Sequence, residues 1–256
     1  MKKIKRIKIT QAANHFFDRA NYLSQFFFDI VSTAEEFDKM RIYVVKSLAN
    51  INGGEPDKED LKHKATYRVK RHIKLIREIW LCRLVECYEN YLSSILKDVF
   101  LCCPDILKSS ETVKIDEILK YDTMEEFVKE LTERKVSELS YSSFDDLFDF
   151  FDKKLKIKII DEENKGFIRE AIETRNISTH NDCVINKRYI SKLSLNEMLL
   201  GCKKVVQARD LAKIERILYE NVKEIDTKLI KKFKIENCII MKEIDKVPHH
   251  NTSSYW

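Results

Sequence analysis

The scarcity of glycine and proline is the feature that most limits the folds open to this chain. Only 4 glycines and 3 prolines occur in 256 residues. A parallel α/β enzyme needs glycines in its strand-to-helix turns, and a phosphate-binding loop needs several within a few positions. No stretch supplies them, so Rossmann, P-loop and TIM-barrel folds are poor candidates, as is a β-sandwich with a turn every ten residues or so. Because helices need few such residues, we expect an all-α fold.

The hydrophobic and cysteine patterns give expectations about location. The longest uncharged runs, such as residues 20–28, are shorter than the about 20 apolar residues that span a bilayer, so no membrane-spanning segment is expected. The basic residues 1–8 lead into polar and aromatic residues rather than an apolar core, so no secretion signal is expected. The seven cysteines are irregularly spaced without a C-x-x-C pair, which favours a reducing cytoplasm. His249 and His250 have no cysteine or carboxylate at ligand spacing, and neither a metal nor a cofactor is expected.

The strongest break in the helical pattern is the segment NGGEP at residues 52–56. Before it, one helix is expected from about residue 10 to residue 30. A second is expected to follow, because Ser32 and Glu35 have the spacing of a capping box. Disorder is expected after Pro248. The predicted parts are an N-terminal helical hairpin extension (1–55), a helical bundle (56–235) and a partly disordered C-terminal tail (236–256).

Periodicity and capping signals divide the bundle into helices. A helical pattern runs from Asp57 to Pro104 and is expected to bend or break in its basic first part. Its second half has a wide apolar arc, which is typical of a central helix contacted from several sides. Further helices are expected to begin at Thr123 with Glu126, at Ser142 or Ser143, at Asp161, and at Ser194 with Glu197, the last reaching about Lys232.

Basic residues are concentrated in one part of the chain. The net charge is only +5, but residues 58–77 contain eight basic and two acidic residues. Such a run on a helix is either a solvated face or a surface that faces phosphates or an acidic partner. For the second interpretation, the candidate RNA contacts are Arg68, Arg71 and Lys74.

The helix expected over residues 161–179 has an arginine on its apolar side. At about 100° per residue, Arg175 projects into the middle of an arc of apolar side chains. An arginine there must be paired or must face a polar group across an interface. Glu89 projects to the border of the apolar arc on the central helix, where a half-buried carboxylate needs a cation. We therefore predict an Arg175–Glu89 pair, with a structural and a catalytic role both open.

Three sequence segments together resemble the HEPN superfamily. The segment RNISTH at residues 175–180 is similar to the R-x4-H signature of that family, in the form where asparagine follows the arginine. The run HNDCVINKRY continues it through residue 189, and YENYL at residues 88–92 resembles an aromatic-Glu-x-aromatic-Leu element of an earlier helix. The resemblance covers residues 58–232. One departure is Cys183, where the family commonly has glycine, so the turn after His180 is open to a different shape.

The resemblance implies a HEPN-like bundle that acts as a metal-independent endoribonuclease. RNA carries its own nucleophile, the 2′-hydroxyl. His180 is then the general base, Arg175 binds the phosphoryl oxygens, and Asn176 orients the histidine or the phosphate. Supporting roles fall to Glu89, Thr179 and Asn181. In the segment that follows, the candidate RNA contacts are Lys187, Arg188 and Tyr189, with a solvated loop as the alternative.

The motif spacing favours a homodimer with the active site at its interface. Residues five apart on one helix differ by about 140° in direction, so Arg175 and His180 do not converge unless the helix ends between them. Asn181 and Asp182 are the expected stop. A two-fold interface solves the problem otherwise, because it brings two copies of the motif into one groove.

Two functional interpretations remain from the sequence. The first is a cytoplasmic ribonuclease of a toxin–antitoxin, abortive-infection or other antiviral defence system, with RNA as substrate and an antitoxin or regulatory protein as partner. This biological setting is implied by the resemblance. The second is a non-catalytic HEPN-like module for dimerisation or partner binding, in which Arg175 and Glu89 are structural ions and His180 only completes the end of its helix.

Overall fold

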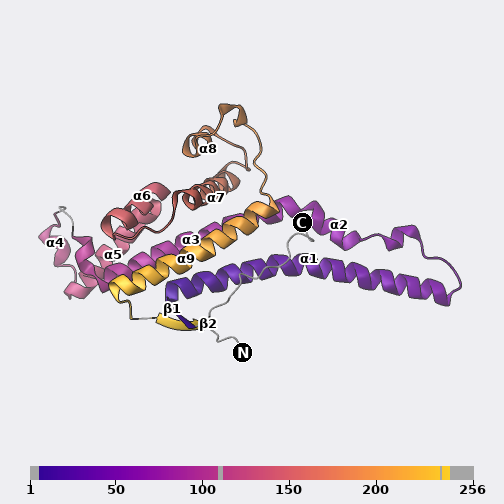
Figure 1. Cartoon of the computed structure of the whole chain (residues 1–256), viewed down its shortest axis with the longest axis horizontal. Coiled ribbons are helices and arrows are strands. Elements are labelled where there is room, and N and C mark those ends of the chain that lie inside the picture. The colour runs from indigo at the N-terminus through magenta and orange to yellow at the C-terminus, as the bar shows by residue number, and fades with distance from the viewer. Residues whose placement is uncertain (1–5, 109–111, 237, 243–256) are drawn as a thin grey trace.

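The computed structural model describes residues 6–108, 112–236 and 238–242 and shows a helical body from which one pair of helices extends as an arm (Figure 1). Helices dominate the described residues, which confirms the all-α expectation. In chain order the elements are β1 (Arg6–Thr10), α1 (Gln11–Ile51), the 3₁₀ turn η1 (Lys58–Leu61), α2 (Lys64–Arg71), α3 (Ile73–Cys102), η2 (Pro104–Leu107), α4 (Ile115–Ile118), α5 (Met124–Tyr141), α6 (Phe144–Asp149), the π-helical turn η3 (Phe150–Lys154), α7 (Glu162–His180), α8 (Lys187–Leu193), η4 (Glu197–Leu199), α9 (Ala208–Phe233) and β2 (Cys238–Lys242).

Helix α3 is the centre of the body, as its wide apolar arc predicts. It packs against α1, α5, α7 and α9. Contact from several sides requires apolar residues around most of the helix circumference. The buried side chains of α3 are Trp80, Leu81, Leu84, Val85, Tyr88, Tyr91, Leu92, Ile95, Leu96, Val99 and Phe100.

Helix α1 is one continuous helix of 41 residues, so the expected hairpin of two helices within residues 1–55 is wrong. Its side-chain cap is Thr10. The predicted second start fails because the Ser32 hydroxyl bonds to the carbonyl oxygen of Asp29 instead of capping a new helix. No glycine or proline interrupts residues 11–51, and nothing in the local sequence ends the helix there.

The two halves of α1 have different surroundings. The first half contributes buried residues such as Phe16 to the same core as α3 and α9, so it is an integral part of the body. The second half packs against η1 and α2 and extends away from the body (Figure 1). We call residues 35–71 the arm.

Buried polar groups tie α1 to α9. Asp226 is fully buried and accepts a hydrogen bond of 2.9 Å from the Thr10 backbone N–H and another from the Thr10 hydroxyl. Ser24 donates to the buried carboxylate of Glu215. Burial raises the pKa of both carboxyls, since the charged form loses hydration. These bonds satisfy polar groups that the core would otherwise leave unpaired.

Several helix boundaries follow the local signals. The basic segment breaks at His72, between α2 and α3, as expected. Thr123 accepts a hydrogen bond from the Glu126 backbone N–H at the start of α5, and Ser143 forms a capping box with Asp146 at the start of α6. Asp161 caps α7.

Other boundaries differ from the sequence prediction. The last long helix begins at Ala208 and not at Ser194, which adopts a left-handed conformation with φ 52° at the end of α8. Glu197 instead begins the 3₁₀ turn η4.

The predicted tail begins with a strand. β2 pairs antiparallel with β1, with Thr10 opposite Cys238, so residues 238–242 are ordered against the N-terminal segment. The disorder expected after Pro248 lies outside the described residues. Among the residues that the structure describes, no helix is both long and apolar enough to cross a membrane.

Candidate functional site

Helix α7 carries the motif and lies against α3 and α9. Its buried face includes Ile168, Ala171 and Ile177. Arg175 extends from this helix to α3 and forms an ion pair with Glu89. The arginine side chain is 25% exposed and the glutamate side chain 39% exposed. The structure thus forms the pair that helical projection predicts, at the edge of the core.

The Arg175–Glu89 pair is only partly satisfied. Burial raises the pKa of Glu89 above its ordinary value, although the charge and hydrogen bond of Arg175 oppose this rise. The Nε atom of Arg175 is buried and forms no hydrogen bond with any described residue. Arg175 thus has an unused hydrogen-bond donor and a half-exposed partner. Exchange of that partner for a phosphate oxygen costs less free energy here than it would for an arginine whose donors are all paired.

His180 is the last residue of α7, and its side chain is exposed. Because the helix continues through His180 and is capped by Asn181, both motif residues lie on one regular helix. Their directions therefore differ by about 140°. Arg175 points to α3, whereas His180 lies at the surface beyond it, so a single chain does not bring the two groups to one phosphate.

The turn after His180 has the shape that favours glycine. Asp182 and Cys183 both have positive φ, 46° and 59°, a conformation in which a side chain is strained. The buried Cys183 sulfur lies 3.2 Å from the Ser178 hydroxyl, and burial raises the pKa of its thiol. Cys183 therefore occupies a left-handed turn, and a buried thiol with a raised pKa is a poor nucleophile.

The supporting residues hold the end of α7 in place. Asn176 donates to Glu173 at 3.4 Å. The Thr179 hydroxyl donates to the carbonyl oxygen of Arg175, and the Asn181 amide donates to that of Val184. The last two side chains therefore act on the backbone at the helix end.

Tyr189, a candidate RNA contact, is buried and is not accessible to RNA in this structure. Its ring is buried in a small cluster with Ile177, Ile185 and Ile190, and its hydroxyl lies 3.2 Å from that of Thr174. Ile185 and Leu193, four residues before and after Tyr189, and the adjacent Ile190 were a signal for burial.

The two basic neighbours of Tyr189 are at the surface. Lys187 is exposed in the first turn of α8. The Nε atom of Arg188 lies 3.9 Å from a carboxylate oxygen of Glu173, a separation too long for a hydrogen bond. Both side chains are therefore accessible to a ligand at this end of α7.

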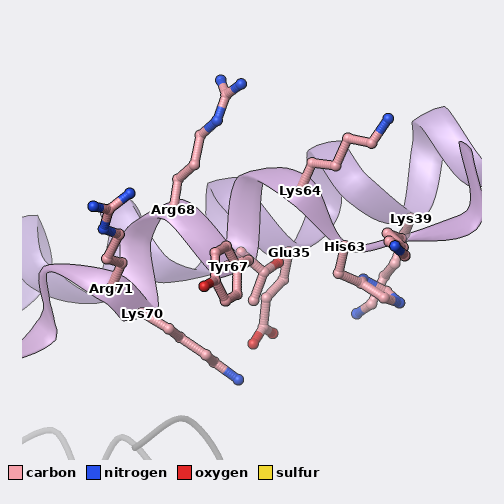
Figure 2. A pocket seen from close by; sticks show the side chains of 10 residues that line it. Glu35, Lys39, His63, Lys64, Tyr67, Arg68, Lys70 and Arg71 are labelled. Carbon is pink, nitrogen blue, oxygen red and sulfur yellow. The ribbon is translucent and has the colours of Figure 1, made fainter. Parts of the chain in front are cut away.

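The basic residues of α2 lie on a different surface, in the arm. Arg68 and Arg71 line a groove of about 990 Å³ between α1 and α2, whereas Lys74 lies outside this lining, exposed on α3 (Figure 2). Lys39, contributed by α1, also lines the groove. The sequence did not reveal Lys39, because its place in the groove depends on how α1 packs against α2.

Comparison with models of known protein families, with curated proteins and with solved structures found no match. Among the residues that the structure describes, no group of three or more histidine, cysteine and carboxylate side chains is placed to hold a metal ion.

Proposed function

We propose that this protein is a metal-independent endoribonuclease whose active site is formed by Arg175 and His180. The observation that carries the proposal is that an arginine and a histidine with different surroundings lie near the same end of α7. A partly satisfied arginine lies at the edge of the core, and an exposed histidine follows five residues later. These groups match a cation that binds phosphate and an imidazole that moves a proton.

The proposed reaction uses the 2′-hydroxyl of the substrate. His180 accepts the proton of that hydroxyl, and the O2′ atom forms a bond to the adjacent phosphorus. The bond from phosphorus to O5′ breaks, and O5′ takes a proton from an imidazolium. The products are a 2′,3′-cyclic phosphate and a 5′-hydroxyl. Arg175 stabilises the negative charge that accumulates on the phosphoryl oxygens, and Asn176 orients the histidine or the phosphate.

A homodimer is part of the proposal, because one chain keeps Arg175 and His180 apart. A two-fold axis near the end of α7 would place the histidine of one protomer beside the arginine of the other. Exposed apolar side chains close to α8 provide surface that such an interface would cover. They are Leu195, Met198, Leu199 and Leu200.

The biological setting is proposed from the resemblance to HEPN ribonucleases. An RNA-cleaving enzyme of this kind suits a toxin or antiviral effector in the cytoplasm, restrained or triggered by a partner protein. The alternative is a non-catalytic dimerisation or partner-binding module. The Arg175–Glu89 ion pair favours it, since an arginine held by a carboxylate is also what a structural ion looks like.

Mixing two inactive variants tests the proposal. Arg175→Ala and His180→Ala are each expected to lose RNA cleavage. Random exchange of protomers gives heterodimers in which one of the two sites has both residues intact, so the mixture should regain about a quarter of wild-type activity. Circular dichroism of each variant checks that it is folded. Recovery supports a composite site. Two variants that cleave RNA as well as wild type would remove Arg175 and His180 from the mechanism, and absence of cleavage by wild type would support the non-catalytic alternative.

A further inference from the structure

The arm carries a groove whose lining is mostly basic. It lies between α1 and α2, and Figure 2 shows side chains from both helices around it. Glu35 is the carboxylate in the lining. The other residues are Lys39, Lys62, His63, Lys64, Thr66, Tyr67, Arg68, Lys70 and Arg71.

Helix α2 forms one wall of this groove, and a buried carboxylate of α1 holds that helix in place. Asp38 on α1 is fully buried and accepts hydrogen bonds from the backbone N–H groups of Ala65 (3.1 Å) and Thr66 (2.8 Å), which are the first-turn donors of α2. Burial favours a higher pKa for Asp38, but these N–H groups and nearby Arg41 outweigh it, so the pKa lies below its ordinary value. The carboxylate is therefore ionised at neutral pH and caps α2.

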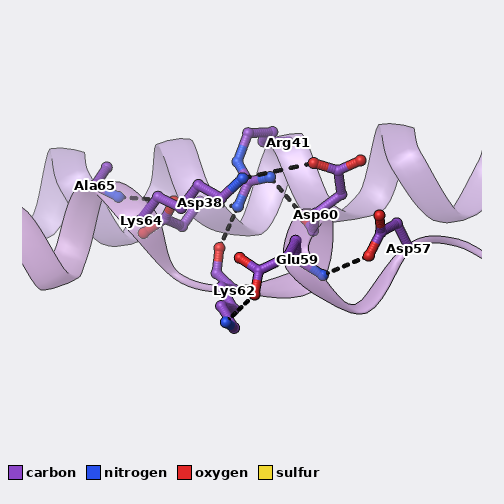
Figure 3. Close-up of polar contacts among 8 residues, drawn as sticks. All are labelled: Asp38, Arg41, Asp57, Glu59, Asp60, Lys62, Lys64 and Ala65. Atoms are coloured by element: carbon purple, nitrogen blue, oxygen red, sulfur yellow. Dashed lines mark hydrogen bonds and ion pairs between the residues drawn. The ribbon is translucent and has the colours of Figure 1, made fainter.

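Arg41 fixes the segment that leads into α2. Its guanidinium donates to the carbonyl oxygen of Asp60 at 2.6 Å and to that of Lys62, and it lies 3.7 Å from Asp38 (Figure 3). Side chains of α1 thus hold both the loop and the first turn of α2. The cations of α2 are presented from a fixed backbone, which is what a binding surface requires.

Most of the charge in the groove is left uncompensated. Lys62 pairs with Glu59, and Lys64 lies 3.6 Å from Asp60. The other four cations are exposed and form no ion pair with the described residues; they are Lys39, Arg68, Lys70 and Arg71. Because these cations have no anionic partner among the described residues, a polyanion that lies along this part of the arm is attracted to them.

An aromatic ring lies among these cations. Tyr67 on α2 is 71% exposed and lines the same groove. Lys64 and Arg71 flank it along α2 (Figure 2). An exposed aromatic ring within a basic groove is the combination with which proteins bind single-stranded nucleic acid, since phosphates contact the cations and a base stacks on the ring.

We infer that the groove of the arm binds a single-stranded segment of RNA, with Tyr67 stacking on a base. The inference rests on the proposed ribonuclease function for its choice of RNA. The groove is also connected to α7. Glu78 follows Arg71 by seven positions, across the break at His72 between α2 and α3, and the Glu78 carboxylate interacts with Cys183 in the turn after α7. RNA held in the groove can therefore extend past Lys74 to the end of α7.

Binding is tested in the His180→Ala background, so that RNA is not consumed. The probe is a fluorescent single-stranded RNA, titrated by anisotropy at several salt concentrations. Lys39→Ala with Lys70→Ala removes one unpaired cation from each wall. We expect the slope of log affinity against log salt to fall by about 1.4, and binding at 0.1 M salt to weaken by roughly 10- to 30-fold. The matched control is Lys129→Ala with Lys231→Ala, two exposed lysines on α5 and α9, which should change neither.

Substitution of Tyr67 gives a second test of RNA binding, because it removes the ring and leaves the charge of the groove unchanged. Tyr67→Ala should weaken RNA binding by about 5- to 100-fold, and Tyr67→Phe, which keeps the ring, should bind like the parent. Equal affinity of the lysine pairs, or of the tyrosine variants, would overturn the inference. Tight binding of a fluorescent acidic peptide in the absence of RNA binding would also overturn it, in favour of a protein ligand. If RNA binds in the groove while wild type never cleaves RNA, the proposed function fails and the binding site stands.

Discussion

Replacement of His180 by alanine is expected to reduce RNA cleavage by about 10²- to 10⁴-fold, which is the contribution of a positioned general acid or base. His180 is exposed at the end of α7, so its removal leaves the packed core untouched. The loss should therefore appear in the cleavage rate and not in the thermal stability. Single-turnover cleavage of a labelled RNA, together with a melting curve, separates the two.

The matched control is His15→Ala, because His15 is also exposed and lies on α1. It should leave cleavage unchanged. An equal loss in both variants would mean that the effect is not specific to the end of α7, and no loss in His180→Ala would remove the imidazole from the mechanism. Activity of His180→Ala that returns with added imidazole would be further support for proton transfer.

Replacement of Phe16 by alanine is expected to lower the free energy of unfolding by about 3–5 kcal/mol. Phe16 is 1% exposed and packs against the rings of Phe17, Tyr91 and Tyr219, with centroids 5.5–6.2 Å away. These rings belong to α1, α3 and α9, so one side chain joins three helices. Urea unfolding followed by circular dichroism measures the change.

Phe37→Ala on the same helix is the control for this measurement. Phe37 is 59% exposed in the arm, and its replacement should change the free energy of unfolding by less than about 0.5 kcal/mol. A large difference between the two variants supports α1 as a core helix in its first half and an arm in its second. If Phe16→Ala cost no more than Phe37→Ala, the first half of α1 would not belong to the core.

Local signals predicted those parts of the fold that depend on local chemistry. Thr123 and Asp161 begin helices where capping rules place them, because a side-chain acceptor three residues before a free backbone N–H needs no tertiary partner. The Arg175–Glu89 pair could also be predicted, since helical projection places an arginine on an apolar face and a carboxylate at the border of the apolar arc of α3.

Features that depend on distant segments were not predicted. Ser32 has the spacing of a cap, but its hydroxyl donates to the Asp29 carbonyl oxygen and α1 continues through it. The strand Cys238–Lys242 forms because its partner, β1, is at the other end of the chain, and five mostly apolar residues alone do not distinguish a strand from other structures. The groove of the arm likewise joins Lys39 to α2 only after folding.

The chemistry of the RNA ends tests the central proposal most directly. Wild type and His180→Ala are incubated with total RNA in EDTA, in the presence of any candidate partner, and the product ends are analysed. The account predicts 2′,3′-cyclic phosphate and 5′-hydroxyl ends from wild type and none from His180→Ala. Cleavage that EDTA abolishes, products with 3′-hydroxyl and 5′-phosphate ends, or intact RNA under every condition would contradict it.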